Sequence, residues 1–121
     1  MNHKFSRKND AIRISDKQGK HVIWEGMPDN CEIIKQLQIQ DRAIHVVLIN
    51  SDEKMGSFQN LIAIDNSGHI LWKAELPDPL TGDMYVDISL QNNRLIAYSW
   101  SGYRVEIDLT SGQIISRKFT K

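Results

Sequence analysis

Asp65-Asn66-Ser67-Gly68-His69-Ile70-Leu71-Trp72 is the stretch that decides the fold, because the chain contains two further copies of it. Asp16-Lys17-Gln18-Gly19-Lys20-His21-Val22-Ile23-Trp24 is one residue longer between Gly and Trp. Asp108-Leu109-Thr110-Ser111-Gly112-Gln113-Ile114-Ile115-Ser116 has Ser in the place of Trp. The aspartates at positions 16, 65 and 108 are 49 and 43 residues apart. Spacing in this range predicts a chain built from repeated supersecondary units.

Short strands surround each copy. Runs that alternate or are apolar throughout are separated by turns rich in Gly, Asn, Asp and Pro, which predicts about ten strands and no helix. They lie at 11–15, 21–25, 32–39, 43–49, 61–64, 70–74, 85–90, 95–100, 103–107 and 113–119. The run at 43–49 has no polar face, so we expect a strand covered on both sides. The basic residues Lys4, Arg7 and Lys8 precede the first run and are expected to be a solvated terminus.

The repeat groups these strands into units. Residues 11–25 supply the last two strands of one unit, and residues 31–74 and 83–119 supply a complete unit each. A period of about 40 to 50 residues made of short strands is typical of β-propeller blades. We therefore predict one all-β domain over residues 1–121, an antiparallel partial propeller of about two and a half four-stranded blades. A twisted β-sandwich of two sheets is the alternative.

Every part of the repeated phrase has a structural use. An Asp side chain accepts hydrogen bonds from amides within a turn, and Gly adopts positive φ at low cost. The Trp is expected to pack its large apolar surface against a neighbouring blade. We therefore expect Asp16, Asp65 and Asp108 to mark hairpin turns rather than to take part in catalysis.

Ala63-Ile64-Asp65-Asn66-Ser67-Gly68-His69-Ile70-Leu71-Trp72 resembles the blade motif of quinoprotein-type β-propellers. In that family the motif runs Ala-x-Asp-x-x-Thr-Gly, with a Trp four residues later. This copy is one residue short before Gly68, while Asp108 to Gly112 keeps the spacing but has Ser111 for Thr. The resemblance implies the blade fold. It does not carry over the family's cofactor, because so few blades close no central channel and the sequence shows no ligand set.

Composition excludes several kinds of protein. The chain has 15 Lys and Arg against 15 Asp and Glu, which argues against a nucleic-acid binder with a basic face. No apolar run approaches the length of about 20 residues that crosses a bilayer, and no apolar stretch follows the N-terminal cations. We therefore expect a complete cytoplasmic protein without membrane contact. Cys31 is expected to be a packing or surface thiol, and His45 a satisfied buried or edge histidine rather than a ligand.

Catalytic patterns are also missing from the sequence. The four histidines are spread singly, and there is no zinc-ligand spacing, phosphate loop or nucleophile elbow. We expect no enzyme activity, metal or cofactor.

Binding to another protein is the preferred function. The loop from Pro77 to Asp83 is long and stiffened by proline, and it is followed by aromatic residues, which with polar surroundings form protein-binding hot spots. The candidate contact residues are Asp78, Asp83, Tyr85, Asp87, Trp100 and Tyr103, with Asp52 and Glu53 in a second loop. The simpler interpretation, which we favour, places Trp100 and one Tyr in the core.

In size, all-β form and lack of catalytic residues the chain resembles the immunity proteins of contact-dependent growth inhibition and related toxin systems. This resemblance implies a cognate protein toxin as partner, with a nuclease as the expected class, and a monomer as the expected state. Acidic side chains such as Asp78, Asp83 and Asp87 would then occupy the cationic cleft of the toxin and set specificity. The alternatives are a domain that binds or processes a carbohydrate or other small ligand, and a propeller fragment completed by a second copy.

Overall fold

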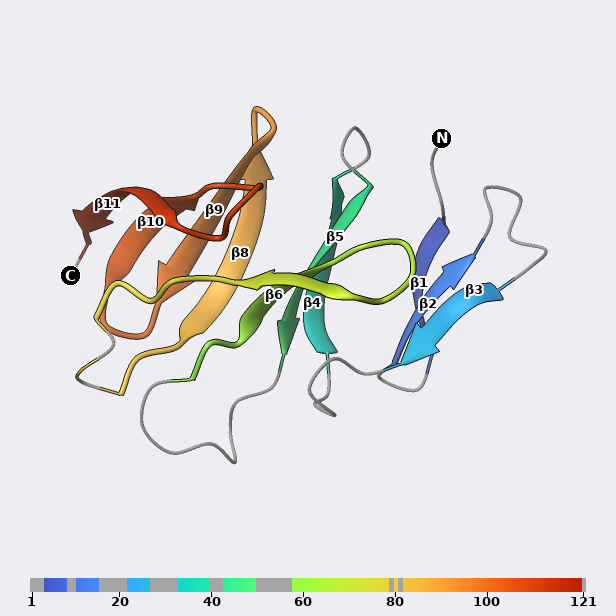
Figure 1. Cartoon of the computed structure of the whole chain (residues 1–121). Coiled ribbons are helices and arrows are strands. Elements are labelled where there is room, and N and C mark those ends of the chain that lie inside the picture. The colour runs from blue at the N-terminus through green and yellow to red at the C-terminus, as the bar shows by residue number, and fades with distance from the viewer. Residues whose placement is uncertain are drawn as a thin grey trace.

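The computed structural model describes residues 4–8, 11–15, 22–26, 33–39, 43–49, 58–78, 80 and 82–120, and for the first three ranges it describes the backbone alone. These residues form eleven strands, which are β1 (Lys4–Lys8), β2 (Ala11–Ser15), β3 (Val22–Gly26), β4 (Ile33–Ile39), β5 (Ile44–Ile49), β6 (Leu61–Ile64), β7 (Ile70–Lys73), β8 (Tyr85–Gln91), β9 (Arg94–Ser99), β10 (Tyr103–Ile107) and β11 (Ile114–Phe119). They pair as three antiparallel sheets, ordered β1-β2-β3, β4-β5-β6-β7 and β11-β10-β9-β8. The sheets follow one another in chain order, with the second sheet between the other two (Figure 1). The predicted all-β class and the two four-stranded units are confirmed.

The first sheet has a strand that the sequence analysis did not predict. β1 pairs antiparallel with β2, from Lys4 opposite Ser15 to Lys8 opposite Ala11. The basic residues of this segment therefore lie in a strand that pairs with β2. The segment was missed because Lys-Phe-Ser-Arg-Lys carries a single apolar residue and so has no hydrophobic period to recognise.

The repeat is visible in the strand register. In the last hairpin of every sheet the strand register shifts just before the repeated Asp. The two four-stranded sheets have a second register shift in their first hairpin, at equivalent positions. These shifts fall at Ile14/Ser15, Ala63/Ile64 and Glu106/Ile107 in the last hairpins, and at Ile33/Lys35 and Tyr85/Asp87 in the first ones. A bulge bends a strand and increases its twist. The shared positions therefore give the sheets the same shape and fix which residues are equivalent.

The turns have the chemistry that the sequence predicts. Asp65 Oδ1 accepts from the amides of Ser67 at 2.8 Å and His69 at 2.9 Å, and Gly68 has φ +84°. Burial acts to raise the pKa of the Asp65 carboxyl, but the amide donors and the neighbouring His69 outweigh it, so that this pKa is lowered. In the third copy Asp108 Oδ1 accepts from the amide of Thr110 at 2.7 Å. Asp65 and Asp108 therefore hold hairpin turns, whereas Asp16 lies outside the described residues.

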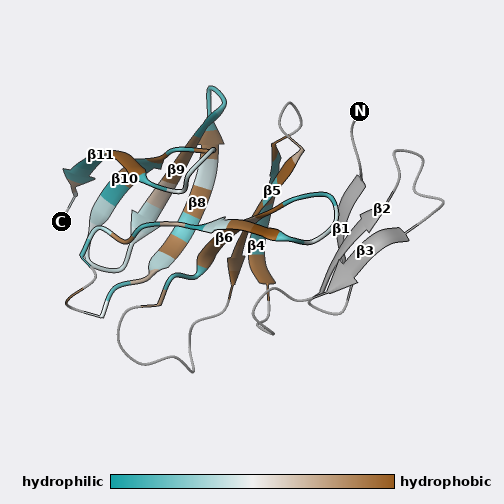
Figure 2. Ribbon diagram, viewed as in Figure 1, coloured by the Kyte–Doolittle hydropathy of each residue, from teal (hydrophilic) through white to brown (hydrophobic). Residues whose placement is uncertain are grey.

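The second sheet is apolar on both faces. All six residues of β5 and all four of β6 are buried, and Figure 2 shows β6 as continuously hydrophobic, whereas β8 is banded. One face belongs to a cluster shared with the third sheet, and the other forms a second cluster from Ile33, Val47, Ile49, Ile62 and Ile64. The prediction of a strand covered on both sides at 43–49 is confirmed. His45 on this strand is fully buried, with Nε2 2.7 Å from Asn66 Oδ1.

Trp72 of the second sheet packs on the third sheet and hydrogen bonds to it. Its ring is buried, and Nε1 donates to the carbonyl oxygen of Leu109 at 2.9 Å, across the sheet boundary. Gly112 lies against the ring so closely that an added Cβ would be 2.6 Å from Trp72 Cε3. The predicted packing of the repeat's Trp on the next blade is therefore confirmed for Trp72. The side chain of Trp24, and Cys31, lie outside the described residues.

Candidate protein-binding site

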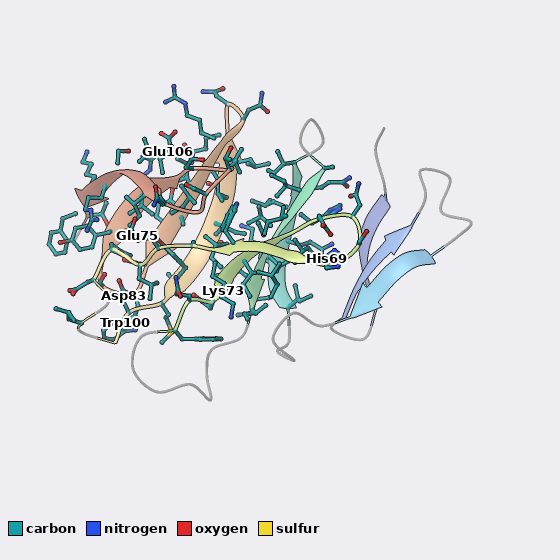
Figure 3. The ribbon with its side chains drawn as sticks, viewed as in Figure 1. His69, Lys73, Glu75, Asp83, Trp100 and Glu106 are labelled. Carbon is teal, nitrogen blue, oxygen red and sulfur yellow. The ribbon has the colours of Figure 1, made fainter. Side chains whose placement is uncertain are left out.

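The antiparallel order of the third sheet brings most of the predicted contact residues to one end. β8 begins there, β9 ends there, β10 begins there and β11 ends there. Tyr85, Trp100 and Tyr103 therefore meet at this end, together with the loop that precedes β8. Figure 3 shows Trp100 and Asp83 near each other at this end of the sheet. Segments that lie apart in the sequence thus meet at one end only because of the sheet topology.

Asp83 is the organising residue of this end. It is fully buried, and its Oδ1 accepts from the amides of Met84 at 2.9 Å and Ser101 at 3.0 Å. Its Oδ2 accepts from the hydroxyl of Ser101 at 2.7 Å and from the amide of Asp78 at 3.3 Å. Ser101 Oγ in turn lies 2.8 Å from Ser99 Oγ. One carboxylate therefore ties the loop before β8 to the turn between β9 and β10.

Tyr85 lies deeper, at the boundary with the second sheet. Its side chain is buried, and its hydroxyl donates to the carbonyl oxygen of Glu75. Burial, assisted by the charges of Asp83 and Glu75, raises the pKa of the Tyr85 hydroxyl above its ordinary range. The buried amide of Asn60 supports the same strand, because Nδ2 donates to the Tyr85 carbonyl at 2.8 Å and Oδ1 accepts from the Tyr85 amide at 2.8 Å. Asn60 thus hydrogen bonds to Tyr85 across the boundary between the two sheets.

These positions correct the prediction for two contact residues. Asp83 and Tyr85 are enclosed and hydrogen bonded within the protein, so a partner cannot reach their side chains. The simpler interpretation is correct for Tyr85, which belongs to the core. It is wrong for Trp100, whose side chain is 61% exposed. A tryptophan at the end of an alternating strand was expected to point inward, but the tight turn after β9 places it outside.

The aromatic residues that stay at least partly exposed at this end form the surface that we call the aromatic end, made of Trp100, Tyr103 and Phe119. The backbone amide of Trp100 donates to Met84 at 2.8 Å, so the turn that carries the indole is fixed. Tyr103 and Phe119 are cross-strand neighbours with ring centroids 5.2 Å apart. The Arg117 guanidinium lies 6.0 Å from the Tyr103 ring and donates to the Pro77 carbonyl at 2.8 Å. The surface is therefore built on hydrogen-bonded backbone.

Asp87 lies away from the aromatic end, where β8 meets β4. Its carboxylate accepts from Lys35 Nζ at 3.0 Å, and the bond to Lys35 is the main reason that the pKa of Asp87 is lowered. Asp78 stands near the aromatic end and is half-buried. Asp52 and Glu53 lie outside the described residues. The predicted acidic patch is therefore dispersed, with Asp83 inside the protein and Asp87 paired with a cation.

A groove runs along the seam between the second and third sheets. Its volume is about 560 Å³, and its lining includes Gln59, Lys73, Glu75, Gln113 and Arg117. Several of these groups are engaged within the protein, since Glu75 Oε1 accepts from the Ile114 amide at 2.9 Å and Gln59 Nε2 donates to the Ala74 carbonyl at 3.1 Å. Within the described ranges no three His, Cys, Asp or Glu side chains gather as a metal site would need, and no helix has the length and hydropathy to span a membrane.

Comparison with known proteins supports the fold. The model of one family, described as a domain of unknown function (DUF7957), matches residues 9–119. The chain belongs to this family. No protein with a curated description matches the DUF7957 chain.

Two solved structures are similar to the DUF7957 fold. One is BamB from Moraxella catarrhalis, a β-propeller protein, with a TM-score of 0.57 and 20% identity over 98% of this chain and 35% of that one. The other is the computationally designed Ika8 protein, with a TM-score of 0.59 and 12% identity over 97% of this chain and 36% of that one. The chain thus spans about a third of the length of these structures. The likeness supports the predicted partial propeller.

Sequence reasoning missed three residues that form or support the candidate site. Phe119 was assigned to a strand but not to a surface, because nothing local shows that it faces Tyr103. Leu80, 94% exposed in the loop before β8, was treated as part of the loop's punctuation. Asn60 preceded a strand and carried no motif. Their roles depend on contacts between distant segments, and a single sequence does not display such contacts.

Proposed function

We propose that the chain binds a partner protein through the aromatic end and that the partner is a cognate toxin whose active site it covers. The observation that carries this proposal is Trp100, a large aromatic side chain held out in solvent on a turn that the buried Asp83 carboxylate immobilises. An exposed tryptophan with no role in the core is the residue type most enriched in hot spots. The structural likeness supports the fold and not the partner.

Rigidity makes this surface suited to binding. An interface loses affinity when loops and side chains become ordered on association, by about 0.5 to 1.5 kcal/mol for each immobilised side chain. Here the turn that carries Trp100 and the loop before β8 are already joined through Asp83. The rings of Tyr103 and Phe119 pack in a tilted arrangement, and the Arg117 guanidinium donates to the Pro77 carbonyl. The aromatic end therefore loses little conformational freedom on binding.

The structure argues for a different contact from the acidic mimicry of phosphate that the sequence suggested. Asp83 faces inward and Asp87 is paired with Lys35, so acidic mimicry of phosphate would rest on Asp78 and on residues outside the described ranges. The proposed contact is therefore aromatic first, with Leu80, Trp100 and Phe119 filling an apolar depression beside the toxin's active site. Asp78 at its edge would affect the rate of association and specificity more than affinity.

The experiment tests the product of the gene next to this one as the toxin. Expression of that product alone should arrest growth, and coexpression of this chain should restore it. In calorimetric titration Trp100→Ala should weaken binding by about 30-fold or more, the equivalent of the 2 kcal/mol that defines a hot spot. Leu71→Ala is the matched control, because Leu71 is also an exposed apolar residue, on β7 in the second sheet, and it should bind as the wild type does.

Two outcomes would oppose the proposal. If the neighbouring product were harmless and part of a metabolic operon, the toxin assignment would fail. If the toxin bound and Trp100→Ala had no effect, the toxin assignment would stand but the aromatic end would not be the contact surface.

The second candidate function is binding or processing of a small ligand in the groove. Its volume lies in the range of about 300 to 1,000 Å³ that is usual for ligand pockets, and Lys73 and Arg117 on its lining suit an anionic group. Turnover on a substrate panel, or a ligand that copurifies and is lost in Arg117→Ala, would favour it over the toxin proposal.

A further inference from the structure

The two faces of the third sheet differ in kind. The face toward the second sheet contributes Tyr85, Ile88, Leu95, Ala97, Val105 and Ile107 to the shared core. Because side chains alternate along a strand, the residues between these point the other way. The residues that define this outer face are Ile96, Tyr98, Arg104, Glu106, Ser116 and Lys118. No described sheet lies over it (Figure 1).

The register allows the outer face to be compared with its equivalent on the second sheet, position by position. Residues of the two sheets can be aligned from the repeated Asp, because the last three strands of each sheet pair in the same register relative to it. The second sheet presents Val46, Leu48, Leu61, Ala63 and Trp72 toward the third sheet, whereas the third sheet presents Ile96, Tyr98, Arg104, Glu106 and Ser116 outward. Three of the five positions have therefore changed from apolar to charged or polar.

The aliphatic residue among the five compared positions, Ile96, is shielded by its own neighbours, whereas Ile115, which lines a pocket with Arg94 and Glu106, is 57% exposed. Ile96 is only 3% exposed, and its cross-strand partners are Ser89 and Glu106. Arg94 Nη1 lies 3.8 Å from Glu106 Oε1. Long charged side chains can cover apolar surface with their stems while their heads remain in water. The outer face thus keeps Ile96 out of water without a covering sheet.

Stacking another sheet on this face would be unfavourable. It would bury Arg104 and Glu106, whose side chains are now partly open to water, and removal of charges from water costs several kcal/mol for each ion. Arg104 would also have to keep its bond to Gln91, at 3.0 Å, without solvent. Repeat proteins end in units with a polar outer face for this reason.

We infer that the third sheet is a capping blade, on whose outer face neither a further blade nor a second copy of the chain stacks. The propeller therefore stays open on this side. A partner meets the ends of the strands, including the aromatic end, and does not complete a ring. This inference does not rest on the proposed function.

The test restores the apolar face. Arg104→Leu, Glu106→Ala and Ser116→Trp together install the residues that the second sheet carries at Leu61, Ala63 and Trp72. In sedimentation equilibrium the wild type should have the monomer mass at all concentrations, and the triple variant should show at least a doubling of its weight-average mass. Ser116→Trp alone serves as a second variant if the triple variant does not fold, and it should shift the mass upward at high concentration.

The control adds similar apolar area elsewhere. Ser67 and Gln113 are exposed on turns away from the outer face, so Ser67→Trp with Gln113→Leu should remain monomeric. The inference is overturned by wild-type self-association that Arg104→Glu weakens. It is also overturned if the folded restored variants remain monomeric, or if the control associates as strongly as they do.

Discussion

Replacement of Gly112 by alanine should destabilise the protein strongly, through two effects that can be separated. Gly112 has φ +76°, a left-handed conformation that costs an L-residue with a Cβ roughly 1 to 2 kcal/mol. The new Cβ would also lie 2.6 Å from Trp72 Cε3 and 2.8 Å from Trp72 Cδ2. The indole cannot move away easily, because its Nε1 is bonded to Leu109 and the ring is buried. Overpacking of this kind costs typically about 1 to 3 kcal/mol.

The expected loss for Gly112→Ala is therefore about 2 to 5 kcal/mol in the free energy of unfolding, a large part of the stability of a small domain. Urea denaturation followed by circular dichroism measures it from the midpoint and slope. Gly112→Asn separates the two effects, because Asn tolerates positive φ but carries the same Cβ. It should keep the steric part of the loss and lose most of the conformational part.

A double-mutant cycle with Trp72→Leu decides the cause. Replacement of the ring by leucine should itself cost less than the roughly 3 to 5 kcal/mol that is typical of truncating a buried tryptophan to alanine. In that background Gly112→Ala should cost only the conformational part, which gives a coupling energy of about 1 to 3 kcal/mol between the two positions. Additive losses would refute the reasoning, since they would mean that the Cβ and the indole do not compete for the same space.

Three further results are expected. Asn60→Ala should cost about 2 to 4 kcal/mol, because it leaves the buried backbone amide and carbonyl of Tyr85 unpaired between the sheets, and Asn60→Asp at neutral pH should not rescue the loss measured in urea. Asp83→Ala should cost about 2 to 4 kcal/mol for the same reason and should increase hydrogen exchange in the Trp100 turn, whereas unchanged exchange there would deny Asp83 its positioning role. The Lys35–Asp87 pair is exposed, so Lys35→Met should cost at most about 1 kcal/mol of stability at pH 7. Lys35 lowers the pKa of Asp87 from its ordinary value of 3.8. The stability that the pair contributes is therefore complete above this ordinary pKa, and it is lost as the pH falls through the lowered pKa of the folded protein. A cost of Lys35→Met that persisted in acid would contradict that assignment.

Local chemistry made the fold predictable. Asp65 with Gly68, and Asp108 with Gly112, each place a turn acceptor and a left-handed residue within a few positions, and their spacing marks the sheets without any knowledge of distant contacts. The uninterrupted run at 43–49 likewise indicated a strand enclosed on both faces. β1 escaped notice because its pairing with β2, and not its own pattern, makes it a strand.

The candidate site was less predictable because its parts come from distant segments. The proline-rich loop and the aromatic residues between Asp78 and Tyr103 indicated a candidate region. The sequence could not show that Asp83 faces inward while Trp100 faces outward, since both lie beside turns and a one-residue change in register reverses the direction of a side chain. The Asp83 carboxylate, which was predicted to contact a partner, instead holds the turn of Trp100.

The third copy of the repeat supports the capping blade from a different direction. The repeated phrase has two functions: its turn receives the tryptophan of the preceding sheet, and its own tryptophan packs on the turn of the next sheet. Trp72 of the second sheet packs in this way on the turn of the third, at Leu109 and Gly112. The third copy keeps Gly112, on which Trp72 packs, and has Ser116 where it would present a tryptophan of its own. A sheet that is followed by another must both receive and present a tryptophan, whereas a capping sheet only needs to receive one. The Ser in place of Trp, which at the level of sequence looks like a degraded repeat, is therefore what a sheet with a solvated outer face requires.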